Sequence, residues 1–142
     1  MHIRDLTVED IPALLEMAKA EPAFQVDGGE GFWTRKQLEC WIRSEDDVLL
    51  AMEMDGKLIG FTLTAHHRPT GKVTLENHFI RADYRGRGVG THLLAKTLVR
   101  LMTAGGTYLH LEVKANNDTA LRFYERFGCR RGENMLWFGK QL

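Results

Sequence analysis

The sequence predicts an α/β fold with a mixed central β-sheet flanked by helices, and three of its features carry that prediction. Apolar residues alternate in strand-like runs and recur at helical spacing in others, in the order β-α-α-β-β-β-α-β-α-β, with room for a further strand. The pair Asp55-Gly56 separates two strand-like runs, as in a tight antiparallel hairpin. Later in the chain a strand, a helix and a strand follow one another, which is typical of parallel strands joined by a crossover helix.

The individual elements follow from periodicity and from the residues that bound them. The expected strands are 2–6, 48–54, 57–65, 73–80, 107–113 and 135–139, and the expected helices are 8–20, 34–44, 89–103 and 118–127. Capping boxes at 7–10 and 34–37 begin the first two helices, and Pro22 ends the first. Gly105-Gly106 ends the third helix, and Gly128 ends the fourth.

Length and composition predict one domain covering residues 1–142, with 44% hydrophobic and 27% charged residues in the range of globular proteins. No apolar run reaches the roughly 18 residues that would span a bilayer, and the N-terminus lacks the pattern of a signal peptide. Cys40 and Cys129 lie far apart without metal-ligand spacing, so free thiols and no metal are expected. We therefore expect a cytoplasmic protein with no membrane partner.

The most informative segment is the glycine-rich turn from Arg85 to Thr91, which lies between an expected strand and an expected helix. Its glycines allow close approach of the backbone to a ligand, and the N–H groups at the start of a helix favour an anion. Arg85 and Arg87 add positive charge. The turn is therefore expected to bind a phosphate group.

Spacing distinguishes between kinds of phosphate site. A Walker A loop counted from Gly86 would need glycine at Thr91 and lysine at His92, so this interpretation fails. A dinucleotide fingerprint lacks its third small residue at Thr91, although Glu112 lies near the spacing of a ribose-binding acid. The series Arg85-x-x-Gly88-x-Gly90 instead resembles the acyl-CoA pyrophosphate loop R/Q-x-x-G-x-G/A of the GNAT N-acetyltransferase superfamily.

A second motif carries the same resemblance. The segment Asn117–Gly128 is similar to the superfamily's N-x-x-A-x-x-x-Y-x-x-x-G element, and the element order from about residue 2 to 142 is similar to that fold. Cys129 departs from the pattern, because an aromatic residue commonly follows this glycine. The resemblance implies an N-acetyltransferase that moves an acetyl group from acetyl-CoA to a primary amine by direct transfer in a ternary complex.

The resemblance also implies which residues bind the cofactor. They are His78, Phe79, Ile80, Arg85, Gly86, Arg87, Gly88, Val89, Gly90, Thr91, Asn117 and Tyr124. The turn would hold the pyrophosphate, and the strand at 78–80 would splay from its parallel neighbour and pair with the pantetheine arm. The N–H of Ile80 would polarise the thioester carbonyl. Asn117 would bind pantetheine or act only as a helix cap.

Two residues are the catalytic candidates on the same resemblance. Tyr124 would be the general acid that protonates the departing thiolate, and Glu76 the base that acts directly or through water. His78 is the reserve base, and strand alternation predicts that Glu76 shares a face with His78 and Thr74. Each candidate also has a plain interpretation, in which Tyr124 packs on aromatic neighbours and Glu76 is an exposed strand carboxylate or pairs with a cross-strand lysine or arginine.

The expected acceptor is a small-molecule amine or an amine of a peptide or protein. The superfamily usually places it beside the loop that corresponds to residues 24–34, where Asp27 and Glu30 would hold a cation and Phe32 and Trp33 would form a wall. The alternative is a solvated loop with aromatic residues in the core.

Two other functions stay open. A non-catalytic acyl-CoA-binding or regulatory domain would keep the phosphate turn without turnover. An RNA-binding module could use the basic residues of 84–88, but the zero net charge argues against a nucleic acid partner. The sequence leaves the acyl chain length and the oligomeric state open, a homodimer included.

Overall fold

The computed structural model describes residues 1–21, 24 and 31–142. The predicted end of a helix at Pro22 and the predicted roles of Asp27 and Glu30 lie outside the described residues. The chain divides into two compact units, Met1–Leu111 and Glu112–Leu142. The single domain expected from the length stays a prediction.

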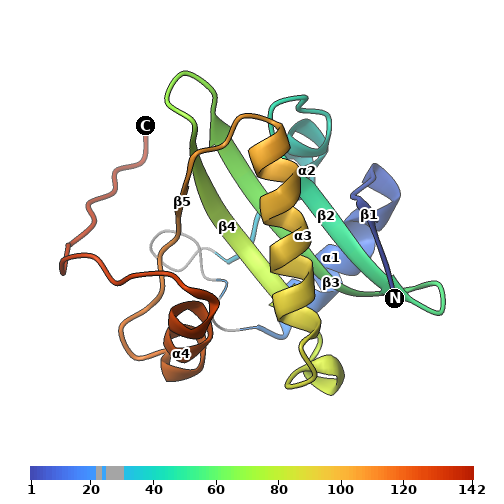
Figure 1. Cartoon of the computed structure of the whole chain (residues 1–142). Helices are drawn as coiled ribbons and strands as arrows, with labels where there is room; N and C mark the ends of the chain where they lie inside the picture. The colour runs from blue at the N-terminus through green and yellow to red at the C-terminus, as the bar shows by residue number, and fades with distance from the viewer. Residues whose placement is uncertain (22–23, 25–30) are drawn as a thin grey trace. The chain divides into compact units, whose positions relative to one another are not determined.

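A mixed sheet forms the centre of the first unit (Figure 1). Its strands are β1 (His2–Asp5), β2 (Leu49–Met54), β3 (Lys57–His67), β4 (Lys72–Ile80) and β5 (Tyr108–His110). They lie in the order β1-β2-β3-β4-β5, with antiparallel pairing from β1 to β4 and parallel pairing between β4 and β5. The predicted α/β fold with an antiparallel hairpin in a mixed sheet is confirmed.

The hairpin turn between β2 and β3 has the predicted chemistry. Asp55 and Gly56 have φ values of 52° and 73°, the positive pair that a type I′ turn requires. The flanking residues Met54 and Lys57 pair directly. The turn therefore sets the register of two of the strands that form the core.

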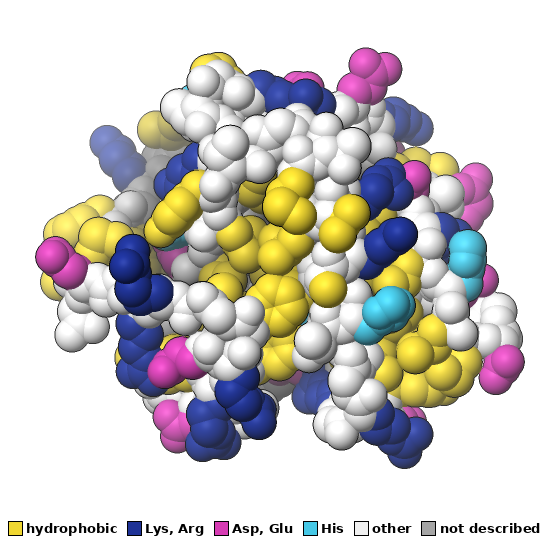
Figure 2. Space-filling view, viewed as in Figure 1, with side chains coloured by type: hydrophobic (Ala, Val, Ile, Leu, Met, Phe, Trp, Pro, Cys, Tyr) yellow, Lys and Arg dark blue, Asp and Glu magenta, His cyan; other side chains and the backbone are white. Residues whose placement is uncertain are grey.

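Helices cover both faces of this sheet, with α3 (Val89–Thr103) on one face and α1 (Ile11–Lys19) and α2 (Arg35–Ile42) on the other (Figure 1). Leu14 and Leu38 pack with Phe61 of β3 in one core, and Leu93 packs with Ile59 in the other. The α3 side of the molecule also shows apolar side chains at its surface (Figure 2). No helix among the described residues is long and apolar enough to cross a membrane.

Capping boxes precede the first two helical segments of the chain. The Asp10 carboxylate accepts a hydrogen bond from the Thr7 N–H (2.8 Å), although the chain makes a 3-10 turn over 8–10 before α1. Thr34 and Gln37 cap α2 reciprocally, with N···O distances of 2.8 and 3.2 Å. Both predicted capping boxes are confirmed.

The second unit contains α4 (Asp118–Phe127), which begins and ends at the predicted residues. The predicted last strand at 135–139 is wrong: residues 112–142, all of them described, form no strand. Met135, Leu136 and Phe138 are 80%, 87% and 92% exposed, so this run buries no face and lacks what stabilises a strand. The strand predicted at 107–113 is shorter than expected, because only Tyr108–His110 pairs with β4.

Candidate functional site

The glycine-rich turn connects the end of β4 to the first turn of α3. Gly86 and Gly88 have φ values of 74° and 76°, a left-handed conformation that residues with side chains rarely adopt. Gly88 is the N-cap of α3, and its carbonyl accepts a hydrogen bond from His92 N–H (3.0 Å). The N–H groups of the first helical turn, 89–91, precede the intrahelical ladder and point beyond the helix. This geometry suits a phosphate group.

The edge of β4 beside this turn extends past its parallel neighbour. Pairing between β4 and β5 is confined to Lys72–Thr74 and Tyr108–His110. The remaining part of β4, from Leu75 to Ile80, pairs with β3 alone among the described strands. The pairing of β5 with β4 therefore ends at Thr74, and the splay predicted for the strand at 78–80 stays a prediction.

The hydrogen-bond pattern shows which backbone groups face that edge. Arg81 N–H donates to Ile59 O on β3 (2.8 Å), in line with the register in which Ile80 lies opposite Gly60. Hydrogen-bonded and non-hydrogen-bonded pairs alternate along antiparallel strands, so Phe79 also faces β3 and Ile80 faces away from it. The N–H and C=O of Ile80 therefore point to the edge that β5 leaves.

Gly60 brings β3 and β4 together behind this edge. A Cβ atom on Gly60 would lie 2.6 Å from the Phe79 carbonyl oxygen and 2.6 Å from the Ile80 Cδ1 atom. Only glycine therefore fits here without a shift of the strands. Gly60 is not among the residues predicted above, although an isolated glycine inside a strand pattern is a signal of close backbone approach.

Arg85 and Arg87 lie in different environments within the turn. The Nε of Arg85 donates to Ile80 O (2.7 Å), its Nη2 donates to Glu21 Oε2 (3.0 Å), and its guanidinium carbon lies 5.4 Å from the centroid of the Phe79 ring. Arg87 is exposed, and no ion pair to it is found among the described residues. Both side chains are exposed, so the two cations differ in their contacts: the Arg85 guanidinium is bonded to Ile80 and Glu21, and Arg87 has no such ion pair among the described residues.

His78 lies against the first turn of α3. A Cβ built on Gly90 would be 3.5 Å from the His78 Cε1 atom, which is ordinary contact. Burial lowers the pKa of His78 to about 4. The imidazole is therefore neutral at pH 7, and it is a weaker base than the ordinary histidine that the sequence interpretation assumed.

Glu76 occupies a β-bulge in β4. Leu63 lies opposite Asn77 and Thr64 lies opposite Leu75, so Glu76 is the additional residue between two pairs, and it is exposed. The prediction from simple alternation that Glu76 shares a face with both His78 and Thr74 is wrong. A bulge inserts one residue and reverses the alternation of faces on its two sides.

The two cores confirm that reversal. Val73 and Ile80 are an odd number of positions apart, yet both belong to the core on the α3 side. Thr74 is one position after Val73 and therefore lies on the face opposite to Val73, whereas His78 is two positions before Ile80 and shares its face, so Thr74 and His78 lie on opposite faces of the sheet. The bulge could not be found from periodicity because it depends on pairing with β3.

Two indole groups hold the strands beside the bulge. Trp33 Nε1 donates to the side-chain oxygen of Asn77 (2.7 Å), and Trp41 Nε1 donates to the backbone oxygen of Thr64 (3.0 Å). The two indole rings form an edge-to-face pair with centroids 5.2 Å apart. Asn77 is not among the residues predicted from the sequence. Trp33, which was expected to form a wall of the acceptor site, donates this hydrogen bond to Asn77.

In the second unit, Tyr124 and Asn117 both lie on or beside α4. Asn117 caps the helix, with its Oδ1 accepting from Ala120 N–H (3.2 Å). The ring of Tyr124 packs edge-to-face on Phe123 (centroids 5.1 Å apart). Burial, with a smaller contribution from Cys129, raises the pKa of Tyr124 well above its ordinary value. Its hydroxyl is therefore protonated at neutral pH.

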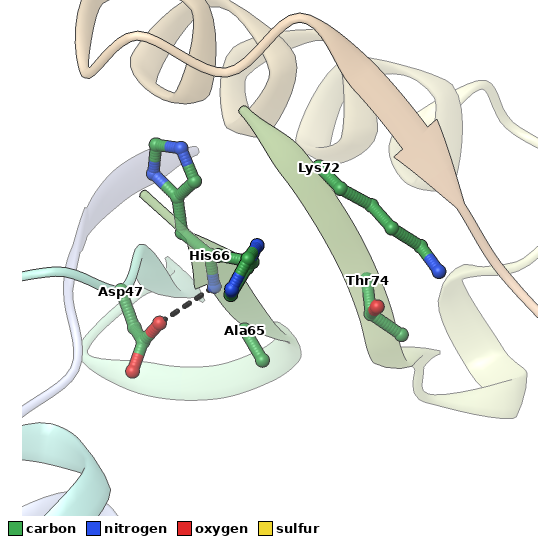
Figure 3. A pocket seen from close by; sticks show the side chains of 6 residues that line it. Asp47, Ala65, His66, Lys72 and Thr74 are labelled. Atoms are coloured by element: carbon green, nitrogen blue, oxygen red, sulfur yellow. Dashed lines mark hydrogen bonds between the residues drawn. The ribbon is translucent and has the colours of Figure 1, made fainter. Parts of the chain in front are cut away.

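A separate pocket of about 570 Å³ lies where β3 ends and β4 begins, at the turn of the β3–β4 hairpin (Figure 3). It is lined by Asp47, Ala65, His66, His67, Lys72 and Thr74. The Asp47 carboxylate accepts a hydrogen bond from the backbone N–H of His66 (2.8 Å). Among the described residues, no group of three or more potential ligands is arranged to hold a metal ion. None of the predicted site residues lines this pocket.

Comparisons with known proteins agree with this arrangement. The model of the acetyltransferase (GNAT) family matches residues 12–129. The uncharacterized N-acetyltransferase MJ1207 of Methanocaldococcus jannaschii is 27% identical over 138 residues, which cover 92% of this chain and 61% of the relative. The chain therefore spans less than two thirds of the length of that relative.

Solved structures show the same fold. The ribosomal-protein-S18-alanine N-acetyltransferase from Escherichia coli is 28% identical, with a TM-score of 0.73 over 89% of this chain and 76% of that one. AAC(6')-Iy in complex with a bisubstrate analogue is 18% identical, with a TM-score of 0.80 over 99% and 98% of the two chains. Since the family model spans both the glycine-rich turn and the Asn117–Gly128 segment, the chain belongs to the acetyltransferase (GNAT) family.

Proposed function

We propose that this chain is an N-acetyltransferase that moves an acetyl group from acetyl-CoA to a primary amine by direct transfer in a ternary complex. The observation that carries the proposal is the position of the glycine-rich turn after the end of β4, where Ile80 points its N–H and C=O away from β3. A ligand with a pyrophosphate and an extended amide-containing arm uses both features, the turn for its charge and the strand edge for its amides.

Acetyl-CoA fits the groups present. The N–H groups of 89–91 and the backbone at Gly86 and Gly88 would hold the pyrophosphate, and the exposed Arg87 would add charge. The edge of β4 at 78–80 would pair with the pantetheine arm. When bound, the cofactor supplies an activated acetyl thioester. Asn117 is proposed as a further contact on the family motif.

The residues then divide the proton transfers between them. Glu76 takes the proton that the acceptor amine loses, directly or through water, and Tyr124 gives a proton to the sulfur that leaves. The Ile80 N–H stabilises the negative charge that develops on the acetyl oxygen, which is worth about 3 kcal/mol for a well-placed donor. The role of Tyr124 rests on the family motif and on its protonated state at neutral pH.

The acceptor is an amine of a small molecule, a peptide or a protein. The E. coli structural relative is named for a ribosomal protein alanine, and AAC(6')-Iy was solved with an acetylneamine analogue. These names support both acceptor classes and favour neither for this chain.

The test is release of free thiol from acetyl-CoA over a panel of aminoglycosides, polyamines, peptides with free N-termini and protein lysines. We expect turnover that depends on one class of amine. Binding of acetyl-CoA without thiol release from any member would favour the non-catalytic acyl-CoA-binding domain, and absence of binding would refute the assignment of the turn.

A further inference from the structure

We infer that the Arg85 side chain is a positioning residue that holds the Ile80 peptide in place for acetyl transfer, and that Arg87 is the arginine that contacts phosphate. The inference rests on the proposed function. It assigns different roles to two arginines that lie two positions apart in the same turn.

Three contacts fix the Arg85 guanidinium at the end of β4. Its Nε hydrogen bond to Ile80 O is 2.7 Å long, and its Nη2 bond to Glu21 Oε2 is 3.0 Å long. The planar group also lies over the ring of Phe79, at 5.4 Å from its centroid. Two hydrogen bonds and the contact with the Phe79 ring together restrict the rotation of the guanidinium group.

The contact to Ile80 acts at the reacting centre. The carbonyl and the N–H of Ile80 point to the same edge from consecutive peptide planes, so a group that holds Ile80 O also restrains the strand backbone that carries the Ile80 N–H. This N–H is the proposed donor to the acetyl oxygen. A displacement of about 1 Å in such a group can cost about a hundredfold in rate.

Glu21 is itself held against the same strand end. Glu21 follows α1. Phe24, three residues later, packs its ring on the ring of Phe79, with centroids 5.6 Å apart. Phe24 N–H also donates to Glu21 O (3.2 Å). The backbone of Glu21 is therefore held by a hydrogen bond to Phe24, which packs on Phe79, in addition to the ion pair of its side chain.

The same contacts argue against a phosphate role for Arg85. Its charge is paired with Glu21, and its backbone N–H donates to Ala82 O (3.1 Å). The Arg85 side chain is 51% exposed, but two of its donors are bonded to Ile80 O and Glu21, and the Glu21 carboxylate would repel a phosphate beside the guanidinium. Arg87 lies exposed between the two left-handed glycines and meets no such obstacle.

The experiment compares Arg85→Gln with Arg87→Gln as a matched pair in the full chain. Calorimetry gives the Kd of CoA, and thiol release gives kcat and KM for acetyl-CoA. We expect Arg85→Gln to lower kcat about tenfold or more while the Kd of CoA changes less than about twofold. We expect Arg87→Gln to raise the Kd of CoA several-fold and to reduce its salt dependence.

Glu21→Gln decides between the two roles even where Arg85→Gln folds poorly. A positioning role predicts a lower kcat with an unchanged Kd of CoA, because the guanidinium loses its anchor. A phosphate-binding Arg85 predicts tighter CoA binding, because its counter-charge is gone.

A several-fold rise in the Kd of CoA for Arg85→Gln, or a kcat that persists while only the melting temperature falls, would overturn the inference. If the parent protein releases no thiol with any amine, the proposed function fails instead. The Kd values of the two arginine variants would then still show which arginine contacts phosphate.

Discussion

The indole N–H of Trp33 donates a 2.7 Å hydrogen bond to the side-chain oxygen of Asn77, the residue that follows Glu76 in β4. Asn77 is only 7% exposed, so this bond satisfies a buried acceptor. Trp33 lies just before α2, and the bond therefore connects the entrance of that helix to the bulge that carries the proposed base.

Trp33→Phe keeps an aromatic ring and removes this donor. We expect the free energy of unfolding to fall by about 1–2 kcal/mol, because the Asn77 oxygen is left buried without its partner. We also expect a lower kcat with little change in KM for acetyl-CoA, because Glu76 shifts. Urea unfolding and thiol release measure the two effects.

The control is Trp41→Phe, which removes the hydrogen bond to Thr64 O on the neighbouring strand. It should cost similar stability with a smaller loss of kcat, because Trp41 bonds to β3, whereas Trp33 bonds to Asn77, the residue that directly follows Glu76 in β4. Equal losses of kcat in both variants would show that the bulge responds as a whole and that Trp33 has no particular role.

Gly60→Ala should be among the most damaging single changes in the sheet. The new methyl group would lie 2.6 Å from the Phe79 carbonyl oxygen, so β3 and β4 must separate behind Ile80. We expect a loss of about 1–3 kcal/mol in stability, as for other overpacked positions. Gly132→Ala is the matched control, because a Cβ there meets nothing within 4 Å. Thermal unfolding that is unchanged in Gly60→Ala would contradict the close approach.

His78 should make stability depend on acid pH. Burial lowers its pKa to about 4 in the folded protein, against about 6.5 in the unfolded chain. Between these values the unfolded state binds more protons, so stability is highest above pH 6.5 and falls as the pH drops toward 4, by up to about 1.4 kcal/mol per pH unit. Urea unfolding of the wild type and of His78→Gln at pH 7, 6 and 5 measures this. An equal slope in both proteins would show that other groups cause the loss.

Local signals predicted the helices of this fold better than they predicted its strands. The bounds of α3 and α4 agree with the prediction because caps, glycines and helical spacing lie within each segment. The bulge at Glu76 depends on the register with β3, which no pattern within β4 reveals. The strand predicted at 135–139 is absent, because a strand-like composition forms a strand only where a neighbouring strand pairs with it.

The site was predictable to the same degree. The turn at 85–91 and its left-handed glycines follow from sequence alone, since their chemistry is local. The contacts of Arg85 with Glu21 and Ile80 were not predictable, because they join the segment that follows α1, the end of β4 and the turn. A basic residue in a phosphate-binding motif can therefore have its side chain committed to protein groups.

Tyr124→Phe tests the proposed general acid with a minimal change, since the phenyl ring can keep its contact with Phe123. Loss of the proton donor should lower kcat about a hundredfold while the Kd of CoA stays within about twofold. Tyr108→Phe is the control, because Tyr108 is 65% exposed and has no proposed part in the chemistry. Thiol release and CoA calorimetry on both variants give the comparison. A kcat for Tyr124→Phe equal to that of Tyr108→Phe would leave Tyr124 only its packing role, and the proton for the departing sulfur would then have to come from water.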